Sequence, residues 1–522
     1  MGPDFSNRVQ SQETLESLIP IIILTGLWVF LSGVGGYAFQ NWDHHWRNAV
    51  FRDLITNDWP VVYSLPEHGP IKMLVYYVGY WLPAALTGKL FGWKFANLIL
   101  FLWTWLGVLL MVLQLSIKLK ASLLKTMFLL VAFSGMDALG VILFAKEYPT
   151  LWPPVQHLEI WAGNLQYSSF TTQLFWVFNQ SVPAWLCILT FVTLSEAKGL
   201  QHEQGDSSLP TPALPSRTGG LAARTVAGGA REERVAQNDM KIFIWALCFF
   251  FAPLASIGLL PYLLIDWFEQ TRKKIKNPLQ DIRVDLFFAG ALIFIISYLF
   301  FSSTTAAQER GLQALDLKDV FVFFLLEGGI LWLLLAPRLW RDPRWAVTGI
   351  LLFIIPFIQL GSGHDFVMRA SIAPLFYLMV WSGESLFKRD SLTTKTHLSF
   401  RERGRHVGAR RQNLEGTKDK YSMLQIGLLV CLIIGALTPL YEINRSIYRT
   451  YEYYFLLSDE QRAQPSLEPA THLKQGGAPE AEHPGSLVAD EIQTLTFMDD
   501  KLTKNFVANV RQSLYYHYLA PR

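Results

Sequence analysis

Two acidic residues follow apolar stretches of the chain, where a carboxylate could act on a substrate at a membrane surface. Asp43 follows the apolar run 18–39, and Asp137 follows the shorter run 121–136. A positioned carboxylate can accept the proton of a hydroxyl group as that hydroxyl attacks a carbon centre. We predict Asp43 and Asp137 as catalytic residues and His44 as an acceptor-binding residue. The alternatives are an interfacial aromatic belt around Asp43 and a solvated helix end at Asp137.

A second polar group lies in the long segment after Asp137. It combines tryptophan and tyrosine rings with hydrogen-bonding side chains, in the residues His157, Glu159, Trp161, Gln166 and Tyr167. Aromatic rings beside hydrogen-bonding groups are typical of sugar-binding sites. We predict that these residues bind the acceptor or the sugar. The alternative is a polar loop without chemistry.

A third group, Asp365 and Arg369, comes directly before the apolar run 371–387. An arginine on the outer side of a membrane needs an anionic partner, because basic residues are disfavoured there. Guanidinium groups bind phosphate oxygens bidentately. We predict that Arg369 and Lys72 bind a phosphate and that Asp365 binds the sugar or acceptor; a salt bridge between Arg369 and Asp365 is the alternative. Glu327 lies inside another apolar run, where a carboxylate is a functional candidate by default.

The elements that would position these residues are membrane-spanning helices. The chain has 522 residues, of which 51% are hydrophobic and 17% charged, whereas a soluble domain has about 25% charged residues. Several apolar runs reach the roughly 20 residues that cross a bilayer. The predicted spans are 18–39, 94–117, 121–136, 182–196, 285–303, 319–337, 346–360, 371–387 and 423–441. The predicted fold is an all-α polytopic membrane protein of about 10 to 12 transmembrane helices, with interfacial helices in the first outer loop.

Two further apolar runs do not fit a simple count of spans. The run 242–267 contains Pro253, Gly258 and Pro261 and could be one tilted helix or a hairpin; the hairpin keeps the basic segments on one side of the membrane. The run 71–88 is short and interrupted, so we predict a re-entrant or interfacial segment. The basic segments that indicate the cytoplasmic side are 118–125, 272–276, 338–344 and 401–411.

This assignment divides the chain into six regions. They are an N-terminal membrane module with outer catalytic loops (1–199), a disordered cytoplasmic insertion (200–239), a second set of transmembrane helices (240–387), a basic cytoplasmic insertion (388–420), the last transmembrane helix (421–442) and an outer C-terminal tail (443–522). The three cysteines all fall in apolar runs, so we expect no disulfide framework or cysteine metal site. The net charge of +3 is too small to indicate nucleic-acid binding.

The order of these segments resembles the glycosyltransferase-C superfamily, in particular bacterial enzymes similar to the aminoarabinose and mannosyl transferases. Asp43 after the first span and Asp137 at the outer end of a later helix are similar to the acidic residues of that family. The other similar segments are Asn57-Asp58-Trp59-Pro60, Gly69 to Leu74 with Lys89-Leu90-Phe91-Gly92, and Arg369 to Pro374. The family's Arg-Tyr pair is replaced here by Arg369-Ala370, and the His157 segment has no counterpart.

The resemblance implies inverting transfer of a sugar from a polyprenyl-phosphate donor to a lipid, glycan or protein acceptor. Asp43 would act as general base, and Arg369 would stabilise the leaving phosphate. Asp137, His157 and Glu159 would hold the acceptor or a divalent metal ion, although a monophosphate leaving group does not demand a metal. The expected location is the bacterial plasma membrane, with the site facing the periplasm.

Three other classes of function remain open at this point. A transporter or flippase of a lipid-linked or anionic solute would use broken helices and mid-membrane charges, which Glu327 and the run 242–267 could supply. A polysaccharide polymerase or ligase would use the same kind of donor, and a non-catalytic assembly protein would use none. The concentration of polar residues in outer loops favours the enzyme.

Overall fold

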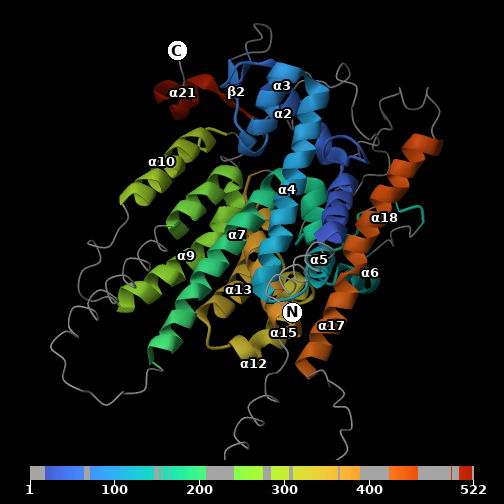
Figure 1. Cartoon of the computed structure of the whole chain (residues 1–522), viewed down its shortest axis with the longest axis vertical. Coiled ribbons are helices and arrows are strands. Elements are labelled where there is room, and N and C mark those ends of the chain that lie inside the picture. Colours follow the sequence, from blue (N-terminus) through green and yellow to red (C-terminus); the bar gives the residue numbers. More distant parts are fainter. Residues whose placement is uncertain are drawn as a thin grey trace, which may run out of the picture.

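The protein is described here from a computed structural model. It describes residues 18–63, 71–145, 152–154, 157–163, 165–206, 240–273, 284–304, 310–361, 365–387, 423–456, 495 and 505–519. These residues form a mostly helical bundle (Figure 1). The predicted insertion 388–420 and most of the insertion 200–239 lie outside the described residues, while helix α7 (Phe170–Asp206) continues past the boundary predicted at 200.

Six helical segments are long and apolar enough to cross a membrane, which supports an integral membrane protein. They are Trp93–Leu119 (α4), Leu123–Phe144, Phe170–Ser195 (within α7), Leu317–Leu339, Asp365–Phe387 and Met423–Leu456. Four of these segments consist of several elements: Leu123–Phe144 contains α5 (Leu123–Ala132) and α6 (Asp137–Phe144), and Asp365–Phe387 contains α14 (Asp365–Ala370) and α15 (Ile372–Phe387). Leu317–Leu339 contains α11 (Leu317–Phe324), η5 (Leu325–Gly329) and α12 (Ile330–Leu339), and Met423–Leu456 contains α17 (Met423–Gly435), α18 (Leu437–Tyr451) and η7 (Glu452–Leu456). Shorter apolar helices cover Leu18–Leu31, Met240–Phe251, Asp285–Phe301 (within α10, Val284–Phe301) and Pro343–Phe357 (α13, Pro343–Ile354, and η6, Ile355–Phe357).

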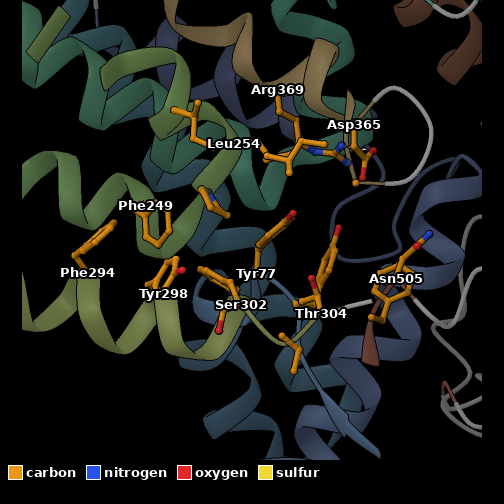
Figure 2. A pocket seen from close by; sticks show the side chains of 18 of the residues that line it. Tyr77, Phe249, Leu254, Phe294, Tyr298, Ser302, Thr304, Asp365, Arg369 and Asn505 are labelled. Atoms are coloured by element: carbon orange, nitrogen blue, oxygen red, sulfur yellow. Dashed lines mark ion pairs between the residues drawn. The ribbon is translucent and has the colours of Figure 1, made fainter. Parts of the chain in front are cut away.

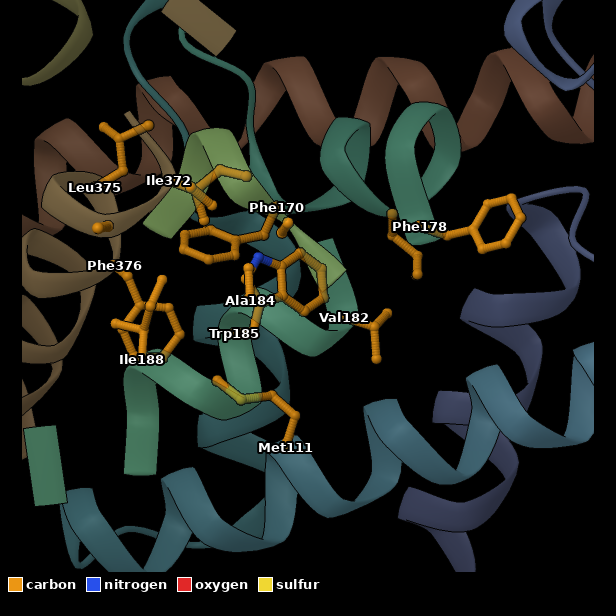
Figure 3. Packing of buried hydrophobic residues seen from close by; sticks show 14 of the residues in the cluster. Met111, Phe170, Phe178, Val182, Ala184, Trp185, Ile188, Ile372, Leu375 and Phe376 are labelled. Atoms are coloured by element: carbon orange, nitrogen blue, oxygen red, sulfur yellow. The ribbon is translucent and has the colours of Figure 1, made fainter. Parts of the chain in front are cut away.

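The core of the bundle lies around α7 and α15. In the most apolar window of Asp365–Phe387, 94% of the residues are buried, whereas only 28% are buried in that of Met423–Leu456. A helix that is apolar on all sides needs protein or lipid on all sides. The first segment therefore meets protein all round, and the second leaves an apolar face for lipid. Figure 3 shows the packing of Met111 from α4, Phe170 and Trp185 from α7, and Phe376 from α15.

The run 242–267 folds back on itself, which confirms the predicted hairpin. Its two arms are the helix Met240–Phe251 and α9 (Pro253–Lys273). Lys241 forms an ion pair with Asp266, and Trp245 Nε1 donates to Ser256 O at 2.9 Å. In a straight helix Lys241 and Asp266 would be separated by about 37 Å, at 1.5 Å per residue. The turn falls at Pro253, whose missing N–H favours an interruption there.

Several predicted boundaries were wrong. The first helix ends at Leu31 rather than at 39, and residues 32–38 form turns and bends. The run 346–360 ends in a strand, β4 (Ile358–Leu360), which pairs with β3 (Arg310–Leu312). The last long helix continues from Met423 to Leu456 instead of stopping at 442.

The chain is also not purely helical, because the predicted C-terminal tail adds a strand to a small sheet. The antiparallel sheet has the order β1-β2-β5, with β1 at Val62–Tyr63, β2 at Lys72–Leu74 and β5 at Val507–Asn509. Beyond β2, the run 71–88 continues as η2 (Val78–Tyr80) and the short helix α3 (Leu82–Phe91). At 10 residues, α3 is about 15 Å long and cannot span a bilayer. The sheet, α2 (Trp42–Thr56), α3 and α21 (Leu514–Tyr518) gather at one end of the bundle (Figure 1).

Candidate functional site

A cavity of about 520 Å³ lies beside this end of the bundle and brings together segments far apart in the sequence. Such a volume suits a ligand of moderate size. Its lining comes from α2, the segment 75–77, the hairpin 240–273, α10, the segment 360–369 and the C-terminal residues 505–506. Both Asp43 and Arg369 line it, together with Asp365. Two of the three polar groups singled out in the sequence therefore meet at one cavity.

Two carboxylate–guanidinium pairs form the charged part of the lining. Arg47 Nη2 contacts Asp43 Oδ2 at 2.7 Å within α2, and Arg369 pairs with Asp365 within α14. Both pairs are four residues apart, so each is positioned by one turn of helix. The Asn41 side chain accepts a hydrogen bond from Asp43 N and caps the start of α2. The guanidiniums are buried, while the Asp43 and Asp365 side chains are 28% and 35% exposed.

Both guanidiniums retain donors that the described residues do not satisfy. Arg47 Nε and Nη1 and Arg369 Nε are buried and have no hydrogen-bond acceptor in the described part of the chain. A buried N–H without an acceptor costs about 1 to 3 kcal/mol, more for a charged group. Both arginines line the cavity, and guanidinium groups suit an anion with several oxygens, such as a phosphate.

The rest of the lining is aromatic and aliphatic. In Figure 2, Arg369 and Asp365 lie on one side of the cavity, while Phe249, Phe294 and Tyr298 lie on the other. Phe249 belongs to the first arm of the hairpin, and the other two rings belong to α10. The cavity is thus amphiphilic, with a guanidinium end and an apolar end.

Two tyrosines and the C-terminal segment complete the lining, and Tyr77 lies between the two ends in Figure 2. Burial raises the pKa of the Tyr76 and Tyr77 hydroxyls, with Arg369 opposing the shift, so both remain neutral donors at physiological pH. Phe506 stacks on Trp46, with ring centroids 5.6 Å apart, and packs against Tyr76 at 4.6 Å. Phe506 O also accepts from Val75 N at 2.8 Å. Asn505 lines the cavity next to it, and its buried Oδ1 lacks a donor among the described residues.

Two residues predicted from the sequence to bind ligand, His44 and Lys72, are not among the described residues that line this cavity. His44 is buried against α7, with Nε2 at 2.9 Å from Phe175 O and its ring stacked on Phe178. Burial, reinforced by Arg47, lowers the pKa of His44 to about 4, so it is a neutral packing residue. Lys72 lies in β2, opposite Tyr63 and Asn509.

The predicted sugar-binding segment forms a separate, buried cluster, which we call the histidine network: His157, Glu159, Gln166, Glu442 and Arg445. His157 Nδ1 donates to Glu442 Oε1, and Arg445 Nη1 contacts both Glu442 oxygens at 3.1 and 3.2 Å. Gln166 Nε2 donates to Glu159 Oε2 at 2.8 Å. Burial alone would lower the pKa of His157, but Glu442 and Glu159 raise it to about 10. The residues of this network bind one another and do not line the cavity, so the expected meeting of three outer segments was wrong for this one.

The remaining predicted residues are Asp137, Trp161 and Tyr167, and none of them is among the residues that line the cavity. They lie around two buried carboxyl groups, those of Asp137 and Glu327. Trp161 Nε1 donates to Glu327 Oε1 at 2.9 Å. Tyr167 is buried, and its hydroxyl donates to Leu352 O. Asp137 is 1% exposed and accepts from Ser134 Oγ at 3.1 Å. The structure therefore places Asp43 and Asp137, the two predicted catalytic residues, at different sites.

No group of three or more histidine, cysteine or acidic side chains in the described part of the chain is arranged to hold a metal ion. Comparisons with known proteins add no assignment: no family model, no curated protein and no solved structure matches the chain.

Sequence reasoning missed Arg47, Tyr77, Asn505 and Phe506. Arg47 could have been found, because it follows Asp43 by one helical turn on a segment already predicted to be helical. The C-terminal pair carries no such signal, because its place depends on the pairing of β5 with β2, across more than 400 residues.

Proposed function

We propose that this protein is a membrane glycosyltransferase that moves a sugar from a polyprenyl-phosphate donor to a hydroxyl of a lipid, glycan or protein acceptor. The observation that carries the proposal is the cavity, which combines unsatisfied guanidinium donors of Arg47 and Arg369 with a partly exposed carboxylate and an apolar extension. A polyprenyl-phosphate sugar has the matching parts: an anionic phosphate, a polar ring and a hydrocarbon chain.

The phosphate would bind between Arg47 and Arg369, because their free N–H groups can form charge-assisted hydrogen bonds. The polyprenyl chain would extend over the hairpin and α10, whose lining side chains are apolar. Asp365 pairs with Arg369 and so helps to position its guanidinium group.

Asp43 is the candidate general base because it is partly exposed, pairs with Arg47 and lines the same cavity. It would take the proton from the acceptor hydroxyl as the oxygen forms a bond to the anomeric carbon. The bond from that carbon to the phosphate oxygen breaks, and its electron pair leaves with the polyprenyl phosphate, stabilised by the guanidiniums. Attack opposite the leaving group inverts the anomeric centre. The location expected from the sequence, the periplasmic face of a bacterial plasma membrane, belongs to this proposal.

The test uses purified full-length protein in nanodiscs with radiolabelled polyprenyl-phosphate sugars and a panel of lipid acceptors. Asp43→Asn is expected to reduce transfer at least 100-fold, as removal of a general base typically does, while donor binding persists. Arg369→Gln is expected to weaken donor binding. The matched controls are Asp58→Asn and Arg310→Gln, which change exposed residues outside the cavity lining. Transfer by Asp43→Asn at the wild-type rate would refute the role of Asp43.

One observation favours a transporter or flippase as the second candidate. The membrane segment Leu123–Phe144 is interrupted between α5 and α6, and Asp137 and Glu327 face each other at this interruption. Broken helices with buried charges are typical of transporter sites. Vesicles containing the protein and a fluorescent lipid-linked sugar distinguish the two: a transporter moves the lipid between leaflets without forming a glycosylated product. Cysteine labelling at positions 43 and 369 from each side of the membrane tests the proposed orientation.

A further inference from the structure

Two distorted helices meet at the carboxyl pair Asp137 and Glu327. Between α5 and α6 the chain is not helical at residues 133–136. Opposite this break, η5 (Leu325–Gly329) forms a π turn in which Ile330 N donates to Leu325 O rather than to Leu326 O. Leu326 O accepts instead from Met136 N at 3.0 Å. The broken helix and the π turn are therefore joined through their backbones, and π turns are frequent at functional sites.

The two carboxyls are buried at this junction and face each other. Asp137 and Glu327 are each 1% exposed, and their carboxyl groups are within hydrogen-bonding contact. Glu327 Oε2 is buried and has no donor among the described residues. The site leaves no room for a larger group, because a Cβ at Gly135 would overlap Glu327 Oε2.

The charged residues around the pair do not compensate the negative charge that two ionised carboxylates would carry. The surroundings contain two further carboxylates, Glu159 and Glu442, and two cations, His157 and Arg445, which engage those carboxylates. Within the described part of the chain, no ion pair reaches Asp137 or Glu327. Two adjacent ionised carboxylates in a dry interior would repel each other strongly. Their direct contact is compatible with a hydrogen bond only if one of them carries a proton.

We propose that Asp137 and Glu327 form a proton-binding site in which one proton is shared between the two carboxyl groups. The proton lies between Asp137 and Glu327 Oε2. Ser134 Oγ and Trp161 Nε1 donate to the outer sides of the pair, at 3.1 and 2.9 Å. The groups that face the pair from other elements are Glu159 and the hydroxyls of Tyr167 and Thr438. By removing the repulsion, the proton holds the interruption after α5 against the π turn. A proton suits this contact better than a metal ion, which would have to separate the carboxyls.

Infrared spectroscopy of the full-length protein in nanodiscs at neutral pH tests this site. A protonated carboxyl group has a C=O stretching band that shifts in D₂O, and ionised carboxylates lack it. The wild-type protein is expected to show this band. Asp137→Asn/Glu327→Gln is expected to lose it because neither position then carries a carboxyl group. Glu327→Gln alone is expected to lose it because the amide at position 327, like Ser134 Oγ, can donate to an ionised Asp137. The control Glu384→Gln changes a carboxylate paired with Lys118 and should keep the band.

Two results would overturn the proposal. The first is a wild-type spectrum that matches that of Glu327→Gln in the protonated-carboxyl region. The second is a thermal midpoint that rises with Na⁺ in the wild-type protein but not in Glu327→Gln, which would assign the site to a monovalent cation. Neither result bears on sugar transfer, because the carboxyl pair does not line the cavity.

Discussion

Replacement of His157 by glutamine distinguishes a structural network from a substrate-binding loop. Glutamine keeps hydrogen-bonding capacity at position 157 but removes the positive charge that lies between Glu159 and Glu442. Among the described residues, Glu442 forms ion pairs with His157 and Arg445. After the change, only the ion pair with Arg445 remains. Removing one partner of a buried ion pair costs about 3 to 5 kcal/mol. A ligand-binding residue, by contrast, would lose affinity for its ligand without a comparable loss of stability.

The pKa of His157 gives a second way to work out the loss of stability expected for His157→Gln. Burial lowers this pKa, but Glu442 and Glu159 raise it from the ordinary 6.5 to about 10. At about 1.4 kcal/mol per pKa unit, this difference corresponds to about 5 kcal/mol, at the top of the range for a broken buried pair. Because the folded-state pKa is raised, the stabilisation is fully present below pH 6.5. It is lost as the pH rises through about 10.

The assay is unfolding of detergent-solubilised protein by a denaturing detergent, followed by tryptophan fluorescence at a series of pH values. We expect His157→Gln to be about 3 to 5 kcal/mol less stable than wild type near pH 6, with the difference shrinking toward pH 10. His517→Gln, an exposed histidine on α21, is the control and should match wild type. The reasoning would be refuted if His157→Gln kept wild-type stability while the KM for the acceptor rose, since that combination identifies a substrate ligand.

Three further predictions concern the cavity and its surroundings. Gly258→Ala is expected to weaken binding of a polyprenyl-phosphate analogue, because a Cβ there would overlap Ala370 O beside Arg369; titration calorimetry measures this, and Gly311→Ala, in open space, is the control. Asn505→Ala is expected to weaken sugar selectivity by about 1 kcal/mol, the value of one hydrogen bond, as measured by competing donors; unchanged selectivity would exclude Asn505 as a sugar contact. Burial raises the pKa of Asp53 to about 6, against hydrogen bonds from Tyr63 and Leu495, so this residue's contribution to stability should fall as the pH rises from about 4 to 6. Asp53→Asn should remove that part of the pH dependence of unfolding, and a persistent slope would assign it elsewhere.

The membrane character and the hairpin were predictable because both depend on local sequence. Apolar runs of sufficient length select a lipid environment, and Pro253 marks the turn between the hairpin arms. The meeting of Asp43 and Arg369 at one cavity followed from placing their segments on one side of the membrane. For the apolar runs and the hairpin, the relevant pattern lies within about 25 residues, which is the range over which helical periodicity and loop length are informative.

The histidine network was not predictable because its partners are distant in the chain. Glu442 and Arg445 lie 285 or more residues after His157, in a stretch where hydropathy falls and a helix end was expected at 442. The helix instead continues to Leu456, because polar residues of α18 are buried against other protein elements rather than exposed to water. Hydropathy cannot distinguish a polar helix face that meets water from one that meets buried polar partners.

The charge balance of the cavity bears on the kind of ligand that it selects. Asp43 and Asp365 offset Arg47 and Arg369, and no other charged residue is among the lining residues that the structure describes. A neutral site exerts little long-range attraction on free anions, so its affinity must come from short-range hydrogen bonds and from apolar contact. The hydrogen bonds alone would serve any phosphate. The apolar lining adds about 0.8 kcal/mol for each buried methylene, a gain available only to an anion that carries a hydrocarbon chain. The combination therefore favours a lipid phosphate over a soluble one, which is the selectivity that the proposed function requires.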